Sequence, residues 1–337
     1  MAEKKPVIGL TIGDPAGIGP EIVLRAVGDV DVRRACRPVV IGHRGLLRKC
    51  ADAIAAPIEG VEIVHVDSPG VEVIVPGVVS AEGGMAADAF VRRACELALA
   101  GEIDAICTAP INKESLRAAG IAHIGHTEML AAYLGSPDPL TMFVTGNMRI
   151  FFLTRHLSLR AAVDRVTRPA VAAFIRRVNT AMKGLGFAAP RIGLAALNPH
   201  ASDGGQFGDE EEKHLIPAAR QAREEGIDVS DPIGADSVFA MALEGRFDCV
   251  ISLYHDQGHI AAKTRDFHGT VTATLGLKVL RTSVDHGTAF DIAWQGRANP
   301  VSMRAAILAA ARLLAADPKQ GEDAGRGFAD RSADARR

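Results

Sequence analysis

The stretch Asp248 to Lys263, DCVISLYHDQGHIAAK, contains an apolar run followed by a polar cluster, and this pattern indicates the fold class. Its first part, Cys249 to Leu253, is short, β-branched and mostly apolar, which is typical of a parallel strand buried on both faces. A polar cluster, Tyr254 to Gly258, follows directly. Open α/β sheets bind ligands outside the carboxyl ends of their strands, which makes this cluster a candidate binding site. Polar residues also end strands for purely structural reasons, so position alone leaves both explanations open.

The same pattern recurs along the chain. Apolar runs typical of strands are Val7 to Ile12, Val39 to Ile41, Val61 to Val66, Ile103 to Cys107, Ile150 to Leu153, Ile192 to Ala196 and Cys249 to Leu253. Amphipathic stretches lie between them, and AADAFVRRACELALAGE shows the helical period most clearly. Its apolar face contains Phe90, Ala94, Leu97 and Ala98, and its polar face contains Arg92, Arg93 and Glu96. Strands that alternate with helices form βαβ crossovers, so the pattern predicts an α/β fold with a mostly parallel sheet.

Three further helices are predicted at Arg168 to Gly184, Asp209 to Glu225 and Val301 to Ala316. The last of these is rich in alanine and leucine and ends before Asp317-Pro318. Residues 319–337 are polar, contain glycine and lack periodicity, so we expect a disordered tail without a function.

Composition excludes several classes of protein. The 337 residues include 38 Lys and Arg and 40 Asp and Glu, so no basic surface is expected for nucleic acid or membrane. The five cysteines are scattered without a C-x-x-C pair, which is typical of reduced thiols. The sequence has no run of roughly 18 apolar residues, and its first residues do not form a secretory signal. We therefore expect a cytoplasmic protein.

Histidines stand out in the loops after three predicted strands. His156, His200 and His255 each follow a strand by a few residues, so the three rings could meet at one edge of the sheet. Three imidazoles with an open position suit a catalytic divalent transition metal. Any one of these histidines taken alone is more often a hydrogen-bonded loop residue than a metal ligand.

Three other loops contain candidate binding groups. TIGDPAGIGPEI, Thr11 to Ile22, has the glycines of a tight strand-to-helix turn but neither a dinucleotide fingerprint nor a P-loop lysine. TAPINKESLRAAG presents Asn112 and Lys113, which suit either an anionic substrate or a capped helix start. LRTSVDHGTAFDIAWQGRANP contains Asp291. Its carboxylate could accept hydrogen bonds from both hydroxyls of the adenosine ribose of NAD and repel the 2′-phosphate of NADP. A capping role for this acid is the alternative.

Taken together, these strings resemble the 4-hydroxythreonine-4-phosphate dehydrogenase (PdxA) family from Val7 to about Leu314. The motifs are GDPAGIGPE, TAPINK, GHTE, NPHA, YHDQG and RTSVDHGTA, and their order and spacing are specific. The resemblance implies a fold like that of isocitrate and isopropylmalate dehydrogenases, with two α/β/α domains and a central cleft. The implied domains are residues 1–125 with 286–318, which hold the cofactor loop, and residues 126–285, which hold the metal and substrate ligands and the dimer interface.

The resemblance also implies roles for individual residues. The family's metal ligands fall on His156, His200 and His255, and the metal would be Zn, Co, Mn, Ni or Mg. Its substrate contacts fall on His126, Thr127, Lys263 and Arg281, with Asp236 and Asp256 as acids near the metal and Lys263 as the candidate for proton transfer. The cofactor loop, which is also similar to that of isopropylmalate dehydrogenases, contributes His286, Gly287, Thr288, Ala289, Asp291 and Asn299 for NAD. Family members are homodimers with a composite active site, so at least one ligand is expected from the partner chain.

One position departs from the biosynthetic enzymes of the family. They have an asparagine that contacts substrate where this chain has Thr272, and HIAAK and RANPVSM look more like the branch that acts on 4-phospho-D-threonate and 4-phospho-D-erythronate. These substrates have a hydroxyl in place of an amine, and an unmatched buried polar group costs about 1–3 kcal/mol, so the polar partner is expected to change. The expected reaction is oxidation of the C3 hydroxyl to a 3-keto acid that decarboxylates.

Several alternatives remain open on the sequence. The first is the 4-phosphohydroxy-L-threonine dehydrogenase of pyridoxal phosphate biosynthesis. Phosphate acyltransferases share the architecture without needing NAD, and terephthalate dihydrodiol dehydrogenases form another branch of the dehydrogenases. A non-catalytic binding module is disfavoured, because a carrier has no need of a hydride acceptor site.

Overall fold

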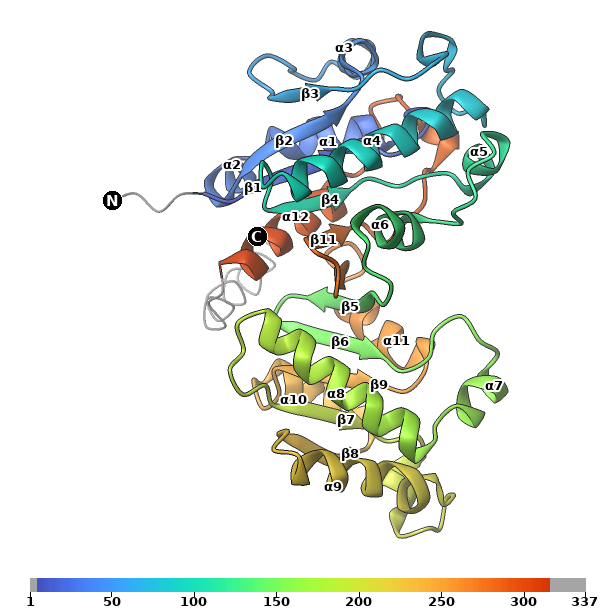
Figure 1. The fold of residues 1–337 in the computed structure, drawn as a ribbon, viewed down its shortest axis with the longest axis vertical. Helices are drawn as coiled ribbons and strands as arrows, with labels where there is room; N and C mark the ends of the chain where they lie inside the picture. The colour runs from blue at the N-terminus through green and yellow to red at the C-terminus, as the bar shows by residue number, and fades with distance from the viewer. Residues whose placement is uncertain (1–4, 316–337) are drawn as a thin grey trace, which may run out of the picture. The chain divides into compact units, whose positions relative to one another are not determined.

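A computed structural model describes residues 5–315. These residues form two compact units (Figure 1). The first unit contains residues 5–140 and Val271–Ala315, and the second contains Thr141–Thr270. The predicted tail, residues 319–337, lies outside the described residues. In residues 5–315 no helix combines the length and apolarity needed to cross a membrane.

The sheet of the first unit contains strands from both ends of the chain. Its order is β3 (Ile63–His65), β2 (Arg37–Gly42), β1 (Val7–Thr11), β4 (Ala105–Thr108), β11 (Leu280–Ser283) and β10 (Val271–Leu275). Neighbouring strands from β3 to β11 are parallel, while β10 and β11 form an antiparallel pair. The carboxyl ends of β1, β2, β3, β4 and β11 therefore lie at one edge, where the candidate loops begin.

Helices cover both faces of this sheet. They are α1 (Gly19–Val27), α2 (Val30–Ala35), α3 (Arg44–Ala53), α4 (Ala81–Leu99), α5 (Lys113–Ala118), α6 (His126–Leu134) and α12 (Val301–Leu314), with short 3-10 turns at Val71–Val73 and Phe290–Ile292. The helix predicted by AADAFVRRACELALAGE is the C-terminal part of α4, and its apolar residues Phe90, Ala94 and Leu97 are buried as expected. Ala94 and Leu97 pack with Ile41, Ile106, Met129 and Leu134 in a core beneath α4 and α6.

The strands that continue into the second unit follow the order β5 (Leu140–Thr145), β6 (Met148–Phe152), β9 (Cys249–Ser252), β7 (Ile192–Ala195) and β8 (Val229–Ile233). The pair β5–β6 is antiparallel, and the pairs β6–β9, β9–β7 and β7–β8 are parallel. The helices of the second unit are α7 (Leu159–Asp164), α8 (Arg168–Gly184), α9 (Ile216–Glu224), α10 (Ala235–Leu243) and α11 (His255–Arg265), with a 3-10 segment at Pro199–Asp203 and a π-helical turn at Glu211–Leu215. Residues of α10 and α11 pack with strand residues such as Phe143, Ile150, Phe152 and Val250 in a second core.

The α/β class predicted from the sequence is confirmed, and most predicted strands occur within a few residues of the expected place. The pattern did not reveal β5, β8, β10 and β11. Helix α8 matches its prediction at both ends, whereas the helix predicted at Asp209 to Glu225 begins with the π-helical turn and becomes α-helical at Ile216.

Candidate functional site

A pocket of about 170 Å³ lies in the first unit, at the ends of β4 and β11. Lys113, His126, Arg281 and His286 are among the residues that line it, and none of its described lining residues is acidic. A pocket lined by cationic side chains without carboxylates favours an anionic ligand. The sequence had left Lys113 open between a ligand contact and a helix start. The structure places it in the first position of α5, after Asn112, whose Oδ1 accepts from the backbone N–H groups of Glu114 and Ser115.

Arg281 is the most buried cation of this pocket, with 5% of its surface exposed. Its guanidinium donates to the Thr108 hydroxyl from Nη2 (2.7 Å) and Nε (3.2 Å), and to the Thr274 hydroxyl from Nη1 (3.2 Å). Burial lowers the pKa of Arg281 to about 10. Both of its hydrogen-bond partners are neutral hydroxyl groups. A bound phosphate or carboxylate would therefore supply the negative charge that a buried guanidinium requires.

His126 and Thr127 form the first residues of α6, after Gly125. The His126 Nε2 atom is buried and, among the described residues, has no hydrogen-bond partner. Burial, and then repulsion by Arg281, lower the pKa of His126 well below its ordinary value, so the ring is neutral at pH 7. A neutral ring next to an anion pocket can donate a hydrogen bond without adding a second full charge beside Arg281.

Thr272 lies on the same face of the β10–β11 hairpin as Arg281. Thr272 pairs with Ser283, and Thr274 pairs with Arg281, so these four side chains point to one side of the antiparallel pair. The position that departs from the biosynthetic enzymes is therefore on the same surface as the buried cation.

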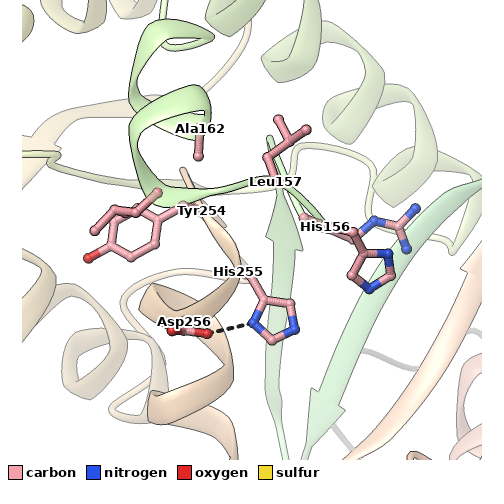
Figure 2. Close-up of a pocket in the computed structure, with 8 residues that line it drawn as sticks. His156, Leu157, Ala162, Tyr254, His255 and Asp256 are labelled. Atoms are coloured by element: carbon pink, nitrogen blue, oxygen red, sulfur yellow. Dashed lines mark hydrogen bonds and ion pairs between the residues drawn. The ribbon is translucent and has the colours of Figure 1, made fainter.

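A second pocket, of about 240 Å³, lies in the second unit and is lined by His156 and His255 (Figure 2). The ring centroids of these histidines are 6.0 Å apart. Nδ1 of His255 is 2.6 Å from Oδ1 of Asp256, and Figure 2 shows His156 on the other side of the ring. A carboxylate at Nδ1 holds the proton there and leaves Nε2 free, which is the arrangement that metal-bound histidines usually have. The residues of this pocket thus fit a divalent metal.

The three candidate ligands follow three neighbouring strands, because β6, β9 and β7 are adjacent and parallel. His156 lies four residues after β6, and His255 opens α11 after β9. His200 follows β7 but is not among the residues that line the pocket of His156 and His255. Its ring is exposed and lies 6.4 Å from that of Phe207.

The backbone at His200 is unusual. His200, Ala201, Ser202 and Asp203 have φ angles of 53°, 52°, 64° and 46°, and Gly204 and Gly205 continue with positive φ. For residues other than glycine this left-handed conformation costs roughly 1–2 kcal/mol each. Such strain persists only where the surrounding structure holds it, and it is concentrated at functional sites.

The other proposed acid-base residues occupy the same unit. Lys263 is in α11, two turns after His255, and its Nζ lies 5.3 Å from the centre of the Phe267 ring. Asp236 is exposed in the first turn of α10. Oδ1 of Asp256, which the family resemblance gave as an acid near the metal, contacts Nδ1 of His255.

A separate histidine cluster in the first unit consists of His43, His65 and Asp67, whose potential ligand atoms lie within 4.8 Å of one another. Nδ1 of His43 accepts the backbone N–H of Leu46, and Nδ1 of His65 accepts that of Arg44. Each neutral ring therefore has its proton on Nε2, the atom that faces Asp67. A metal needs a deprotonated nitrogen, so these contacts favour a hydrogen-bonded cluster over a metal centre.

The proposed cofactor loop, residues 286–299, is held by the glycine-containing loop after β1. The backbone N–H of Ile18 donates to the Thr288 carbonyl (2.9 Å), and the indole N–H of Trp294 donates to the Pro15 carbonyl (3.1 Å). The buried carboxylate of Glu21 accepts from the backbone N–H groups of Gly296 (3.3 Å) and Ala298 (3.0 Å). A Cβ at Gly17 would lie 2.9 Å from Thr288, so only glycine permits this approach.

The candidate nucleotide contacts lie along this loop. Thr288 is buried, Ala289 adopts a φ of 41°, and His286, Gly287, Asp291 and Asn299 are exposed. The Asp291 carboxylate is exposed on a loop that is held at both ends. It can accept hydrogen bonds from the hydroxyls of a nucleotide's ribose.

Comparison with known proteins identifies the family of this chain. Residues 34–310 match the family model described as pyridoxal phosphate biosynthetic protein PdxA. The chain belongs to the PdxA family. This member is 48% identical to a putative D-threonate 4-phosphate dehydrogenase of Symbiobacterium thermophilum, over 93% of this chain and 98% of the relative. The family resemblance seen in the sequence is thereby confirmed.

Solved structures of dehydrogenases are also similar to this chain. A 4-hydroxythreonine-4-phosphate dehydrogenase from Klebsiella pneumoniae is 37% identical, with a TM-score of 0.85 over 93% of this chain and 100% of that chain. A terephthalate 1,2-cis-dihydrodiol dehydrogenase from Burkholderia xenovorans is 32% identical, with a TM-score of 0.62 over 89% and 96% of the two chains. This PdxA family member is thus an oxidoreductase by family, as the sequence predicted.

Proposed function

We propose that this protein oxidises the C3 hydroxyl of a four-carbon, 4-phosphorylated hydroxy acid, with NAD as the hydride acceptor and a divalent metal as cofactor. The observation that carries the substrate assignment is the pocket around Arg281, where a buried guanidinium is held by two threonine hydroxyls and where no acidic residue is among the described lining residues. Such a pocket selects an anionic group.

Within this class, 4-phospho-D-threonate or 4-phospho-D-erythronate is the proposed substrate. Two features support this choice: the relatives named for D-threonate 4-phosphate, and Thr272 on the surface that Arg281 shares. A threonine hydroxyl can both donate to and accept from a substrate hydroxyl. The alternative substrate is 4-phosphohydroxy-L-threonine, which the names of similar solved structures favour.

His156, His200 and His255 would hold the metal, and Asp256 would orient His255. A divalent ion bound there would act as a Lewis acid on the substrate hydroxyl and lower the cost of removing its proton. Lys263, in the same helix as His255, would accept a proton as the neutral amine and return it as the ammonium, and its flexible stem suits that role. Lys113, His126, Thr127 and Arg281 would bind the anionic end of the substrate.

The product of this oxidation is a 3-keto acid, whose carboxylate lies beta to the new carbonyl. Loss of carbon dioxide from it leaves an enolate, which Lys263 would protonate. Asp291 would accept hydrogen bonds from the adenosine ribose and so favour NAD over NADP.

The enzyme is proposed to act as a homodimer whose active site combines groups from both chains. His200 supports this, because it does not line the pocket that contains His156 and His255. An exposed ring on a strained turn is suited to completing a site that its own chain leaves open.

The deciding experiment measures NADH formation with Mn²⁺ or Zn²⁺ across 4-phospho-D-threonate, 4-phospho-D-erythronate, 4-phosphohydroxy-L-threonine and a terephthalate dihydrodiol. The highest kcat/KM is expected for one of the first two. A higher kcat/KM for 4-phosphohydroxy-L-threonine would assign the biosynthetic reaction to this enzyme. A higher kcat/KM for the dihydrodiol, which has no phosphate, would contradict the proposed phosphate-binding role of the Arg281 pocket. Full turnover after removal of metal with EDTA would contradict the metal assignment.

A further inference from the structure

The left-handed turn that contains His200 is tied to the segment Glu210–Glu212. The Ser202 hydroxyl, which is fully buried, donates to both carboxylate oxygens of Glu212 at 2.9 and 3.0 Å. Ser202 is in the middle of the run of positive φ angles, with φ of 64°. The contact between Ser202 and Glu212 thus holds the central residue of the left-handed turn in place.

The beginning of the same turn is held from the same segment. The carboxylate of Glu211 is fully buried and accepts from the backbone N–H groups of Leu197 and Asn198, each at 2.8 Å. The side-chain amide of Asn198 donates to Glu211 (2.8 Å) and to Glu210 (2.7 Å). Glu211 opens the π-helical turn, a distortion that often occurs at functional sites.

The acidic segment is not itself a cation site. Glu211 already accepts three hydrogen bonds, and Glu212 accepts from Ser202 with both oxygens. The carboxylate oxygens of Glu211 and Glu212 accept hydrogen bonds from the turn that contains His200. The segment therefore holds the backbone of that turn and does not bind a ligand.

We propose that Glu210–Glu212 is a clamp that holds residues 198–205 in the left-handed turn and thereby presents the His200 ring for metal binding. Ser202 and Glu212 are its central pair, and both are positioning residues. The inference depends on the proposed metal-binding role of His200. Without the clamp, Ala201, Ser202 and Asp203 would return to ordinary backbone angles, and metal binding would have to restore the turn.

The test is a double-mutant cycle on metal affinity. Wild type, Ser202→Ala, Glu212→Ala and the double variant are titrated with Co²⁺, and the visible absorption of the bound ion gives Kd without reference to turnover. Each single variant is expected to weaken Co²⁺ binding about 10- to 100-fold, the usual effect of removing a group that supports a metal ligand. The double variant is expected to be no weaker than the worse single variant, because both substitutions remove one contact.

Two further variants separate a positioning role from general damage. Thr180→Ala removes an exposed hydroxyl from α8 in the same unit and should leave Kd unchanged. Ser202→Gly should recover part of the affinity that Ser202→Ala loses, because glycine adopts positive φ without strain. Additive losses in the cycle, or a Ser202→Ala Kd within twofold of wild type, would overturn the clamp.

The metal role of His200 is tested separately by His200→Ala. Loss of Co²⁺ binding in this variant supports the ligand assignment on which the clamp depends. If His200→Ala binds Co²⁺ as wild type does, the proposed metal site is wrong, and the clamp fails with it. A clamp that fails while His200→Ala abolishes binding leaves the proposed function intact.

Discussion

The Thr108 hydroxyl accepts two hydrogen bonds from the guanidinium of Arg281, at 2.7 and 3.2 Å, across the adjacent strands β4 and β11. Both side chains are buried. The contact therefore gives two guanidinium N–H groups a hydrogen-bond partner and holds Arg281 at the wall of the pocket.

Thr108→Val should therefore destabilise the protein and weaken substrate binding. Valine keeps the shape but leaves buried N–H donors unpaired, which costs about 1–3 kcal/mol of unfolding free energy. KM for the phosphorylated substrate should rise, as measured by initial rates of NADH formation. Thr108→Ser keeps the acceptor and serves as the control; wild-type stability and KM in Thr108→Val would show that the hydroxyl does not support Arg281.

Complementation between inactive variants should show whether the metal site is composite. His200→Ala and His255→Ala are each expected to be inactive. Mixed and reassociated dimers should recover about one quarter of wild-type activity, because half of the dimers are heterodimers and each has one intact site if the ligands come from different chains. His156 and His255 line one pocket, so the mixture of His156→Ala with His255→Ala should stay inactive. Recovery in neither mixture would place His200 in the same site as the other two rings of its own chain.

Stability should fall in acid because of His126. Its folded-state pKa is lowered well below 6.5 by burial and by Arg281, whereas the ring in the unfolded chain titrates near 6.5. Above that pH both states are neutral and the stability is fully present. Below it only the unfolded chain takes up the proton, so unfolding free energy should decrease by up to about 1.4 kcal/mol per pH unit. Urea titrations of wild type and His126→Gln from pH 7.5 to 5.5 should show a smaller loss in the variant, while the exposed His268→Gln should behave as wild type.

Asp291→Ala should impair use of NAD and spare the substrate. Loss of two charge-assisted hydrogen bonds to the ribose should raise KM for NAD by about 10- to 100-fold, with a much smaller change for substrate. The preference for NAD over NADP should also decrease, because a carboxylate no longer repels the 2′-phosphate. Asp52→Ala, an exposed acid in α3, is the control. Unchanged kinetics with both cofactors would remove Asp291 from the nucleotide site.

The five cysteines should be unreactive in the native protein. All are buried, and burial raises the pKa of Cys36 to about 11 and those of Cys50, Cys95 and Cys107 to about 12, with Cys249 raised further. Thiolate, the reactive form, is scarce at pH 8 for such groups. Ellman's reagent should titrate few thiols in buffer and five per chain in guanidinium chloride. Rapid reaction of the native protein would indicate an opening of one of the cores.

Sequence patterns revealed the strands that read as continuous apolar runs and missed four others, among them β10 and β11. β1, β7 and β9 are continuous apolar runs, so their signal is strong. β10 and β11 read VTATL and LRTS, because Arg281 lines the anion pocket and the Thr274 hydroxyl accepts a hydrogen bond from its guanidinium. The chemistry of the site thus weakens the hydrophobic signal of the strands that build it.

The candidate site shows the same limit. Motif order identified His126, Arg281 and the loop histidines, and the structure shows that His156 and His255 share a pocket. Sequence could not show that Thr108 and Thr274 support Arg281, since a threonine at the end of a strand is common and the contact with Thr108 spans 173 positions. The left-handed turn at His200 had only Gly204-Gly205 as a signal, because four other residues adopt positive φ there against their own preference.

The first unit is built from both ends of the chain, which constrains the order of events during synthesis. β4 has β1 on one side and β11 on the other, yet the ribosome makes β11 only after all of Thr141–Thr270. The emerging polypeptide therefore has an unpaired edge on β4 while the whole inserted segment is translated and can fold. Chaperone protection of nascent chains should accordingly concentrate on lengths before Leu280 and end once α12 has left the exit tunnel.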